Sequence, residues 1–287
     1  MFQRVDLHTH SSCSDGLLTP AQLVERAAAR QVELLALTDH DTASGCNDAR
    51  AACQMYGIRF VPGIELSCLW REREIHVVGL GIDSSAAALL RHCAALLEQR
   101  RERILAITQR LSRAGLPGEA LAAEALAAAA PTRTHLARAL CRRGLTQTVQ
   151  AAFDRWLGHG QAGYVSPRWP QLSAAVRCIA EAGGVAVLAH PHRYRVSNGV
   201  LRELAAEFKA AGGAGIEVSL AGMGPRDADR AAALARRFEL AGSIGSDFHE
   251  PEVPWRPLGR FAKLPEEIGP ITARLGLEHD GEDRSER

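Results

Sequence analysis

The sequence VDLHTHSSCSDG at residues 5–16 carries two histidines directly after a short apolar run that predicts a β-strand. In a strand, side chains two residues apart point to the same side, so His8 and His10 converge on one point. Similar short runs that end in polar residues recur at 34–38, 58–65, 75–82, 185–189, 215–219 and 243–247. The opening stretch therefore predicts the first unit of a repeating architecture.

Helical patterns separate most of these predicted strands. Residues 19–30 open with a Thr-Pro start signal and keep Leu23, Val24 and Ala27 on one face. Residues 173–182, 199–211 and 226–241 repeat this arrangement. The alternation of strand and helix predicts the α/β class, as a β/α barrel or a related parallel sheet.

One connection breaks the alternation. The runs at 58–68 and 75–82 are separated by too few residues for a parallel crossover, which needs about a dozen. We therefore expect an antiparallel hairpin at this place, which makes the barrel irregular. The hairpin would start His76 on the same face of the sheet as Glu65.

Residues 84–163 differ from the rest of the chain. They show helical patterns at 86–114, 118–130, 135–143 and 146–157 and no convincing strand. We predict a helical insertion that lies over one face of the barrel, whose core is then discontinuous, at 1–83 and 164–277. The charged tail at 278–287 is expected to be disordered.

Composition limits the partners and the compartment. The formal net charge is +1, from 34 Lys and Arg against 33 Asp and Glu, which argues against the coating of long nucleic acid. The seven cysteines are odd in number and form no C-x-x-C pair, so we expect reduced thiols and a cytoplasmic location. The sequence shows neither a signal peptide nor an apolar stretch of transmembrane length, so no membrane partner is expected.

Ionisable residues gather at the predicted strand ends. The set comprises six histidines and three carboxylates: His8, His10, His40, His76, His190, His249, Asp15, Glu65 and Asp247. A single histidine at a strand end is commonly a capped or surface residue, but burial of so many ionisable groups without a metal would be costly. At three or four protein ligands per ion, the set suffices for two or three divalent ions. Asp39, beside His40, either orients a ligand or forms a turn.

These motifs resemble those of the PHP (polymerase and histidinol phosphatase) family of metallo-phosphoesterases. The motifs follow in the family's order over residues 1–83 and 166–250. They are DLHTHS with the following SDG, TDHDT, GIELS, the histidine before VVGLGID, AHPHR and GSDFH. The resemblance implies a distorted seven-stranded, TIM-like barrel with a trinuclear metal centre. It also implies that His8, His10, Glu65 and Asp247 bind the first ion, Glu65, His76 and His190 the second, and Asp15, His40 and His249 the third.

The resemblance also suggests the metal and the chemistry. Asp15 stands where some relatives have histidine, and a carboxylate there favours a harder ion, so Mn²⁺ is expected, with Zn²⁺ or Fe²⁺ as alternatives. Metal-held hydroxide would attack phosphorus in line, without a Ser or Cys nucleophile. Glu65, Asp247 and His192 are the catalytic candidates.

Two basic segments are candidates for substrate contact. Arg133 and His135 lie in PTRTHLARAL, where a phosphate could meet a helix N-terminus, and Arg193 and Arg195 follow the His190 motif. Each arginine could equally belong to a solvated face. Both segments and the insertion resemble a PHP subgroup that acts on 3′,5′-nucleoside bisphosphates and on short 5′-phosphorylated oligoribonucleotides. This resemblance implies removal of the 3′-phosphate to leave the 5′-mononucleotide, with small nucleotides or short RNA as partners.

Several other functions remain open at this point. The same site could belong to a 5′→3′ exoribonuclease, or to a histidinol-phosphate phosphatase, which the insertion fits less well. Metal-dependent amidohydrolases also use H-x-H on a first barrel strand. Lys209 and Lys263 lie away from strand ends, which argues against the subtype with a carboxylated-lysine bridge but leaves a lysine-free amidohydrolase open. A non-catalytic module is disfavoured, because the complete set of ligands is present.

Overall fold

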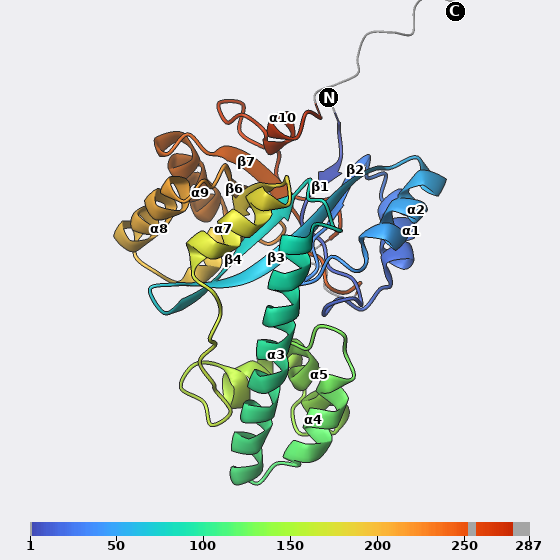
Figure 1. Ribbon diagram of the computed structural model, residues 1–287, viewed down its shortest axis with the longest axis vertical. Coiled ribbons are helices and arrows are strands. Elements are labelled where there is room, and N and C mark those ends of the chain that lie inside the picture. The colour runs from blue at the N-terminus through green and yellow to red at the C-terminus, as the bar shows by residue number, and fades with distance from the viewer. Residues whose placement is uncertain (1, 252–256, 278–287) are drawn as a thin grey trace, which may run out of the picture.

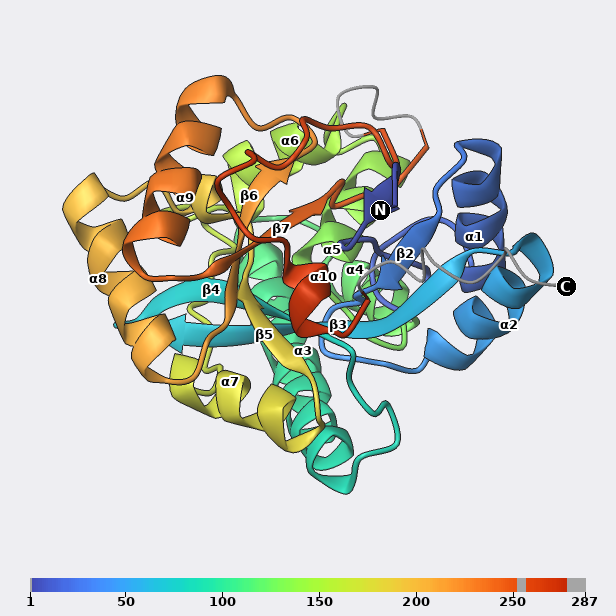
Figure 2. The ribbon, with the colours of Figure 1, turned by 90° about the horizontal axis from the view of Figure 1, so that it is seen from above.

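A computed structural model describes residues 2–251 and 257–277 of the chain. Within these residues one sheet holds the strands in chain order: β1 (Val5–Asp6), β2 (Leu34–Leu37), β3 (Arg59–Trp70), β4 (Arg73–Leu80), β5 (Val185–Leu188), β6 (Gly215–Leu220) and β7 (Ala241–Gly245). The backbone N–H of Leu7 donates to Ile244 O at 3.1 Å, which brings the chain after β1 against β7 and nearly closes the barrel. The α/β class and the distorted seven-stranded barrel are confirmed (Figures 1 and 2).

The antiparallel hairpin accounts for the distortion. Strand β4 runs antiparallel to both of its neighbours, whereas the other neighbouring strands are parallel. The predicted hairpin is therefore confirmed in β3 and β4. Strand β3 extends further than expected, to Trp70, so Glu65 lies inside it instead of at its end. Strand β4 is shifted by two residues, because its pairing with β3 begins at Arg73, and it ends at Leu80. Glu65 still bridges to His40 just after β2, which keeps it level with the ends of the other strands.

Helices surround the strands (Figure 2). They are α1 (Pro20–Ala29), α2 (Cys46–Tyr56), α7 (Leu172–Glu181), α8 (Asn198–Ala210), α9 (Pro225–Arg237) and the short α10 (Ile271–Arg274). The expected start of α1 is a capping box, in which the Thr19 side chain accepts from the Gln22 backbone. Helix α9 ends at Arg237, earlier than the pattern at 226–241 suggested, because Glu239 has a positive φ of 51° that stops the helix.

The barrel interior is apolar below the strand ends. Leu7, Leu34, Val61, Val78 and Val187 are buried in one cluster. A larger apolar cluster lies between the strands and α7, α8 and α9. Interiors packed in this way are rigid, so the residues at the strand ends are held in fixed positions.

The chain between β4 and α7 is helical, and we call it the insertion. It contains α3 (Ala87–Arg113), α4 (Gly118–Leu126), α5 (Arg133–Arg142), α6 (Val149–Ala152) and a π-helix at Phe153–Leu157. These helices have a core of their own, with Ile107, Leu121 and Leu136 fully or almost fully buried. Figure 1 shows α3 leaving the barrel and running along the lower part of the molecule, beside α4 and α5. Arg100 of α3 pairs with Asp41 at 2.6 Å, which ties the insertion to the barrel.

Two further expectations concern membrane-spanning helices and the C-terminal tail. No helix in the described part of the chain is long and apolar enough to span a bilayer. The tail at 278–287, predicted to be disordered, lies outside the described residues.

Candidate metal centre

The predicted metal ligands come together at the end of the barrel where the parallel strands β1, β2, β5 and β7 terminate. His8 and His10 follow β1, His40 follows β2, Glu65 and His76 lie on the hairpin, His190 follows β5, and Asp247 and His249 follow β7. Three sets of residues have ligand atoms that all lie within 4.8 Å of one another. The first set is His10, Asp15, His40 and His249, the second is His8, His10 and Glu65, and the third is His40, Glu65 and His76. Residues that are far apart in the sequence thus form one continuous cluster.

Glu65 is the centre of this cluster. It is fully buried, and its Oε1 lies 2.8 Å from His190 Nε2 and 3.0 Å from His76 Nδ1. Its Oε2 lies 2.9 Å from His40 Nδ1 and 3.3 Å from His10 Nε2. One carboxylate therefore faces imidazoles from several strands.

Two smaller groups lie on either side of Glu65. On one side, Asp247 Oδ1 is 3.4 Å from His8 Nε2 and 3.3 Å from His10 Nε2. On the other side, Asp15 Oδ1 is 3.2 Å from His249 Nε2. Asp247 adopts a positive φ of 51°, a conformation that is costly for a residue other than glycine and is typical of functional sites.

Buried atoms without hydrogen bonds indicate that the cluster suits a metal. Glu65 Oε2, His40 Nδ1 and Asp15 Oδ1 are buried and make no hydrogen bond to any of the described residues, although they lie close to other donors and acceptors. His8 Nε2 and His10 Nε2 are only 3.0 Å apart. Lone pairs of imidazole nitrogens and carboxylate oxygens that converge in this way are the donor set of a divalent transition metal. The residues present therefore fit divalent metal ions.

The electrostatics of the cluster keep its carboxylates ionised. Burial raises the pKa of the Glu65 carboxyl group, but His40, His76 and His8 outweigh burial and hold that pKa well below its usual value. Burial lowers the pKa of His10, but the adjacent carboxylates of Asp247 and Glu65 raise it to about 9. In the metal-free protein a proton on His10 therefore competes with a metal ion for the ring nitrogen.

The assignment of ligands to individual ions stays a prediction. The cluster places His40 near Asp15 and His249, as expected, but also near Glu65 and His76. His190 lies beside Glu65 Oε1 and belongs to none of the tight sets.

Glu217 is a residue of the site that the sequence analysis missed. It lies in β6 and is 1% exposed, and its Oε1 accepts from His8 Nδ1 at 2.7 Å, while its Oε2 accepts from the His190 backbone N–H. The bond to Nδ1 fixes the tautomer of His8 and directs the Nε2 lone pair toward the cluster. An acidic residue in the otherwise apolar stretch GIEVSL was the signal that could have revealed it.

Asp39 orients the loop after β1. It accepts from Ser11 N at 2.7 Å, from Ser11 Oγ at 2.6 Å and from Ser14 Oγ at 2.6 Å. These bonds fix the segment between His10 and Asp15. Of the two interpretations of Asp39, the structure therefore favours the positioning of ligands.

The insertion also contacts the cluster. Thr132 Oγ1, at the start of α5, donates to Asp15 Oδ2 at 3.0 Å. Arg138, one turn further along α5, donates to the backbone oxygen of Asp15 at 2.7 Å. Asp15 is therefore held by the insertion as well as by the barrel.

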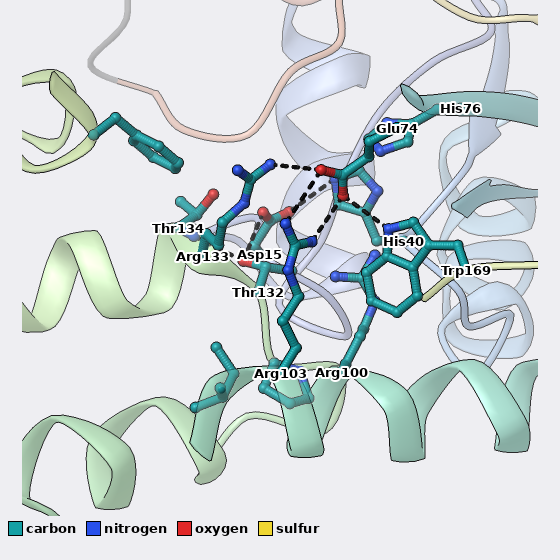
Figure 3. A pocket seen from close by; sticks show the side chains of 13 residues that line it. Asp15, His40, Glu74, His76, Arg100, Arg103, Thr132, Arg133, Thr134 and Trp169 are labelled. Carbon is teal, nitrogen blue, oxygen red and sulfur yellow. Dashed lines mark hydrogen bonds and ion pairs between the residues drawn. The ribbon is translucent and has the colours of Figure 1, made fainter. Parts of the chain in front are cut away.

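A cavity of about 150 Å³ lies where the insertion meets the cluster. Asp15, His40 and His76 line it together with Arg100, Arg103 and Arg133 (Figure 3). Arg133 was predicted to contact substrate and lies in this cavity. Arg103 was missed, because its position depends on how the long α3 packs against the hairpin.

The other candidate substrate residues occupy different positions. His135 Nδ1 accepts from Thr132 N at 3.0 Å and so completes the N-terminal cap of α5. Arg193 forms an ion pair with Asp247, a predicted ligand. Arg195 is exposed, and His192 is half-buried with its Nδ1 shielded from solvent.

Comparison with known proteins places this chain in a family. The family described as PHP domain matches residues 6–165, more than half of the 287 residues. A 5′-3′ exoribonuclease from Haemophilus influenzae is 40% identical over 94% of this chain and 98% of its own length. A 3′,5′-nucleoside bisphosphate phosphatase from Chromobacterium violaceum is 40% identical over 94% of this chain and 96% of its own length.

A solved structure agrees with this placement. It comes from Chromobacterium violaceum and is described as an amidohydrolase with bound SO4 and no metal. It is 40% identical, covers 95% of this chain and 96% of its own, and superposes with a TM-score of 0.90. The family predicted from the histidine motifs is confirmed, and the chain belongs to the PHP domain family.

Proposed function

We propose that this protein is a metal-dependent phosphatase that hydrolyses the 3′-phosphate of nucleoside 3′,5′-bisphosphates and leaves the 5′-mononucleotide. One observation carries the proposal: side chains that could hold a metal and three arginines line the same cavity. Arginine suits the recognition of phosphate groups. The similarity to a 3′,5′-nucleoside bisphosphate phosphatase along nearly the whole chain supports the same substrate.

The protein side chains prepare the site for this reaction. Bound divalent ions, with Mn²⁺ as the proposed metal, would supply a water-derived nucleophile and neutralise charge on the phosphoryl oxygens. Glu65, Asp247 and Asp15 are buried carboxylates, and nearby positive groups hold the pKa of each well below its usual value, so all three stay ionised. Their negative charge makes the cluster a strong site for cations.

The residues around the ligands keep their geometry fixed. Glu217 holds His8, and Arg193 pairs with Asp247, so neither ligand has to be ordered when an ion binds. Preorganised groups of this kind need little reorganisation during the reaction. We assign Arg193 the role of orienting Asp247. His192, whose buried Nδ1 makes no hydrogen bond within the part of the chain that the structure describes, stays the candidate catalytic group outside the ligand set.

A 5′→3′ exoribonuclease acting on short 5′-phosphorylated RNA is the second candidate function. The relative from Haemophilus influenzae supports it, and the same cluster could serve both phosphodiester and phosphomonoester hydrolysis. The near-neutral net charge still speaks against long nucleic acid as substrate. We also propose that the protein is located in the cytoplasm.

A panel of four substrates tests the proposal. Protein loaded with Mn²⁺ is incubated with adenosine 3′,5′-bisphosphate, a 5′-phosphorylated RNA trimer, histidinol phosphate and an N-acyl amino acid. Phosphate release that is fastest from the bisphosphate supports the phosphatase. Mononucleotide release from the trimer alone would assign the exoribonuclease, and amide hydrolysis without phosphate release would refute both.

A further inference from the structure

Helix α5 of the insertion begins beside the metal cluster. Its N-terminal cap, Thr132, is buried, and the Thr132 Oγ1 donates to Asp15 Oδ2 at 3.0 Å (Figure 3). The core of the insertion sets the position of α5, and Leu136 and Leu140 of this helix are fully buried in that core. A predicted metal ligand of the barrel is therefore bonded to a helix that packs in a separate core.

The hydrogen bonds around Thr132 direct its hydroxyl hydrogen to Asp15. Oγ1 accepts from the Thr134 backbone N–H at 3.1 Å, which leaves the hydroxyl hydrogen for another acceptor. His135 Nδ1 lies 3.1 Å from Oγ1, but it already accepts from the Thr132 backbone N–H at 3.0 Å. An imidazole nitrogen has one lone pair, whereas a carboxylate accepts several hydrogen bonds. The cap of α5 thus fixes the donor that faces Asp15.

The two carboxylate oxygens of Asp15 have different surroundings. Oδ2 is bonded to Thr132, whereas Oδ1 is buried and makes no hydrogen bond within the described residues. Oδ1 lies 3.2 Å from His249 Nε2 and 3.8 Å from His40 Nε2. Because Thr132 holds Oδ2, the carboxylate cannot rotate without losing that hydrogen bond. Oδ1 is therefore held toward the other ligands.

A second side chain of α5 holds the backbone on both sides of this group. Arg138 Nη1 donates to the Asp15 backbone oxygen at 2.7 Å, and Arg138 Nη2 donates to Glu250 Oε2 at 3.3 Å. The Arg138 side chain is 14% exposed, and Glu250 directly follows His249. Helix α5 therefore contacts the chain at Asp15 and next to His249, two segments that are far apart in the sequence.

We propose that α5 completes one metal position of the cluster, with Thr132 as the positioning residue for Asp15. The position is the set formed by His10, Asp15, His40 and His249. Ion binding at this position is coupled to the docking of α5 on the barrel, because the ion and Thr132 hold the same carboxylate. The inference rests on the proposed function for its divalent metal but not for its substrate, so a failed substrate panel with normal Mn²⁺ binding leaves it standing.

A double-mutant cycle tests whether Thr132 acts through Asp15. Mn²⁺ is titrated calorimetrically into the wild type, Thr132→Val, Asp15→Ala and the double variant. Asp15→Ala should lose the ion at this position, and Thr132→Val should bind the same ion about 10- to 100-fold more weakly, with the other ions unchanged. The double variant should bind Mn²⁺ as Asp15→Ala does, because Thr132 then has no carboxylate to position.

Two further variants separate positioning from the stability of a helix. Thr132→Ser keeps the hydroxyl group and should bind Mn²⁺ with wild-type affinity. Thr148→Val is the matched control, because Thr148 is exposed and caps α6 of the same insertion by accepting from Ala151 N at 3.1 Å. This control should also bind Mn²⁺ as the wild type does. Wild-type affinity in Thr132→Val, an equal loss in Thr148→Val, or a further loss when Thr132→Val is added to Asp15→Ala would overturn the proposal.

Hydrogen exchange measures the coupling at the helix. Coupling between two events is reciprocal, so an ion at this position should stabilise the docked α5. We expect Mn²⁺ to slow amide exchange in α5 at least about fivefold in the wild type and to leave it unchanged in Asp15→Ala. Equal slowing in both proteins, or no slowing in the wild type, would also overturn the proposal.

Discussion

Replacing Glu217 by glutamine tests how the metal ligands are held. The carboxylate uses both oxygens, one for His8 Nδ1–H and one for the His190 backbone N–H. Glutamine has one oxygen and one NH₂ group, so in either orientation of the amide an N–H group faces another N–H group. With the wild-type tautomer of His8, one of the two hydrogen bonds is therefore lost around a side chain that is 1% exposed.

The expected magnitude follows from the buried donor. An unsatisfied buried donor costs about 1–3 kcal/mol, and loss of a partner that orients a metal ligand lowers metal affinity by about 10- to 100-fold. The loss of the Nδ1 bond also allows the His8 proton to move to Nε2, the atom that faces His10 at 3.0 Å. We therefore expect Mn²⁺ affinity to fall about 10- to 100-fold in Glu217→Gln.

Two measurements check this prediction. Titration with Mn²⁺, followed by calorimetry, gives the affinity, and ¹⁵N chemical shifts of His8 in the metal-free protein report its tautomer. Glu203→Gln is the matched control, because Glu203 lies on α8, is 52% exposed and pairs with Arg71 away from the cluster. A Glu217→Gln protein with wild-type affinity and the wild-type His8 tautomer would refute the role given to Glu217.

Three further predictions concern catalysis, stability and protons. Asp247→Ala should abolish turnover with an unchanged far-UV circular dichroism spectrum, and wild-type activity would contradict the metal centre. Arg100→Met leaves the buried Asp41 carboxylate without its charged partner, so urea denaturation should show a loss of about 3–5 kcal/mol in the free energy of unfolding. The control Arg101→Met removes an exposed side chain and should lose about 0.5 kcal/mol or less. Because the pKa of His10 is raised to about 9, the His10 ring of the metal-free protein carries a proton at pH 7.5 and releases it when a metal ion binds. Mn²⁺ affinity should therefore rise as the pH rises toward 9. Calorimetry in buffers of different ionisation enthalpy measures the released protons, and a binding enthalpy that is independent of buffer would contradict this pKa.

The histidines and carboxylates of the cluster were readable from the sequence because their signals are local. His8 and His10 lie two residues apart directly after an apolar run, and Asp247 and His249 repeat the pattern. A short connection was also enough to predict the hairpin that brings His76 beside Glu65, which the structure places 3.0 Å apart.

The supporting residues could not be predicted, because their partners are distant in the sequence. Glu217 contacts His8 across 209 positions, and Arg133 contacts Glu74 across 59. Nothing near either residue in the sequence indicates such a partner. Helix α2 was missed for a different reason, since its buried face is made of alanine and cysteine and gives only a weak apolar period.

Hydrolysis in ¹⁸O-labelled water tests the central claim most directly. Wild-type protein loaded with Mn²⁺ is given adenosine 3′,5′-bisphosphate, and the products are identified by mass spectrometry. The proposed attack on the 3′-phosphorus predicts inorganic phosphate that carries one ¹⁸O atom, together with unlabelled adenosine 5′-monophosphate. Release of adenosine 3′-monophosphate, label in the nucleoside, or no phosphate release would contradict the account.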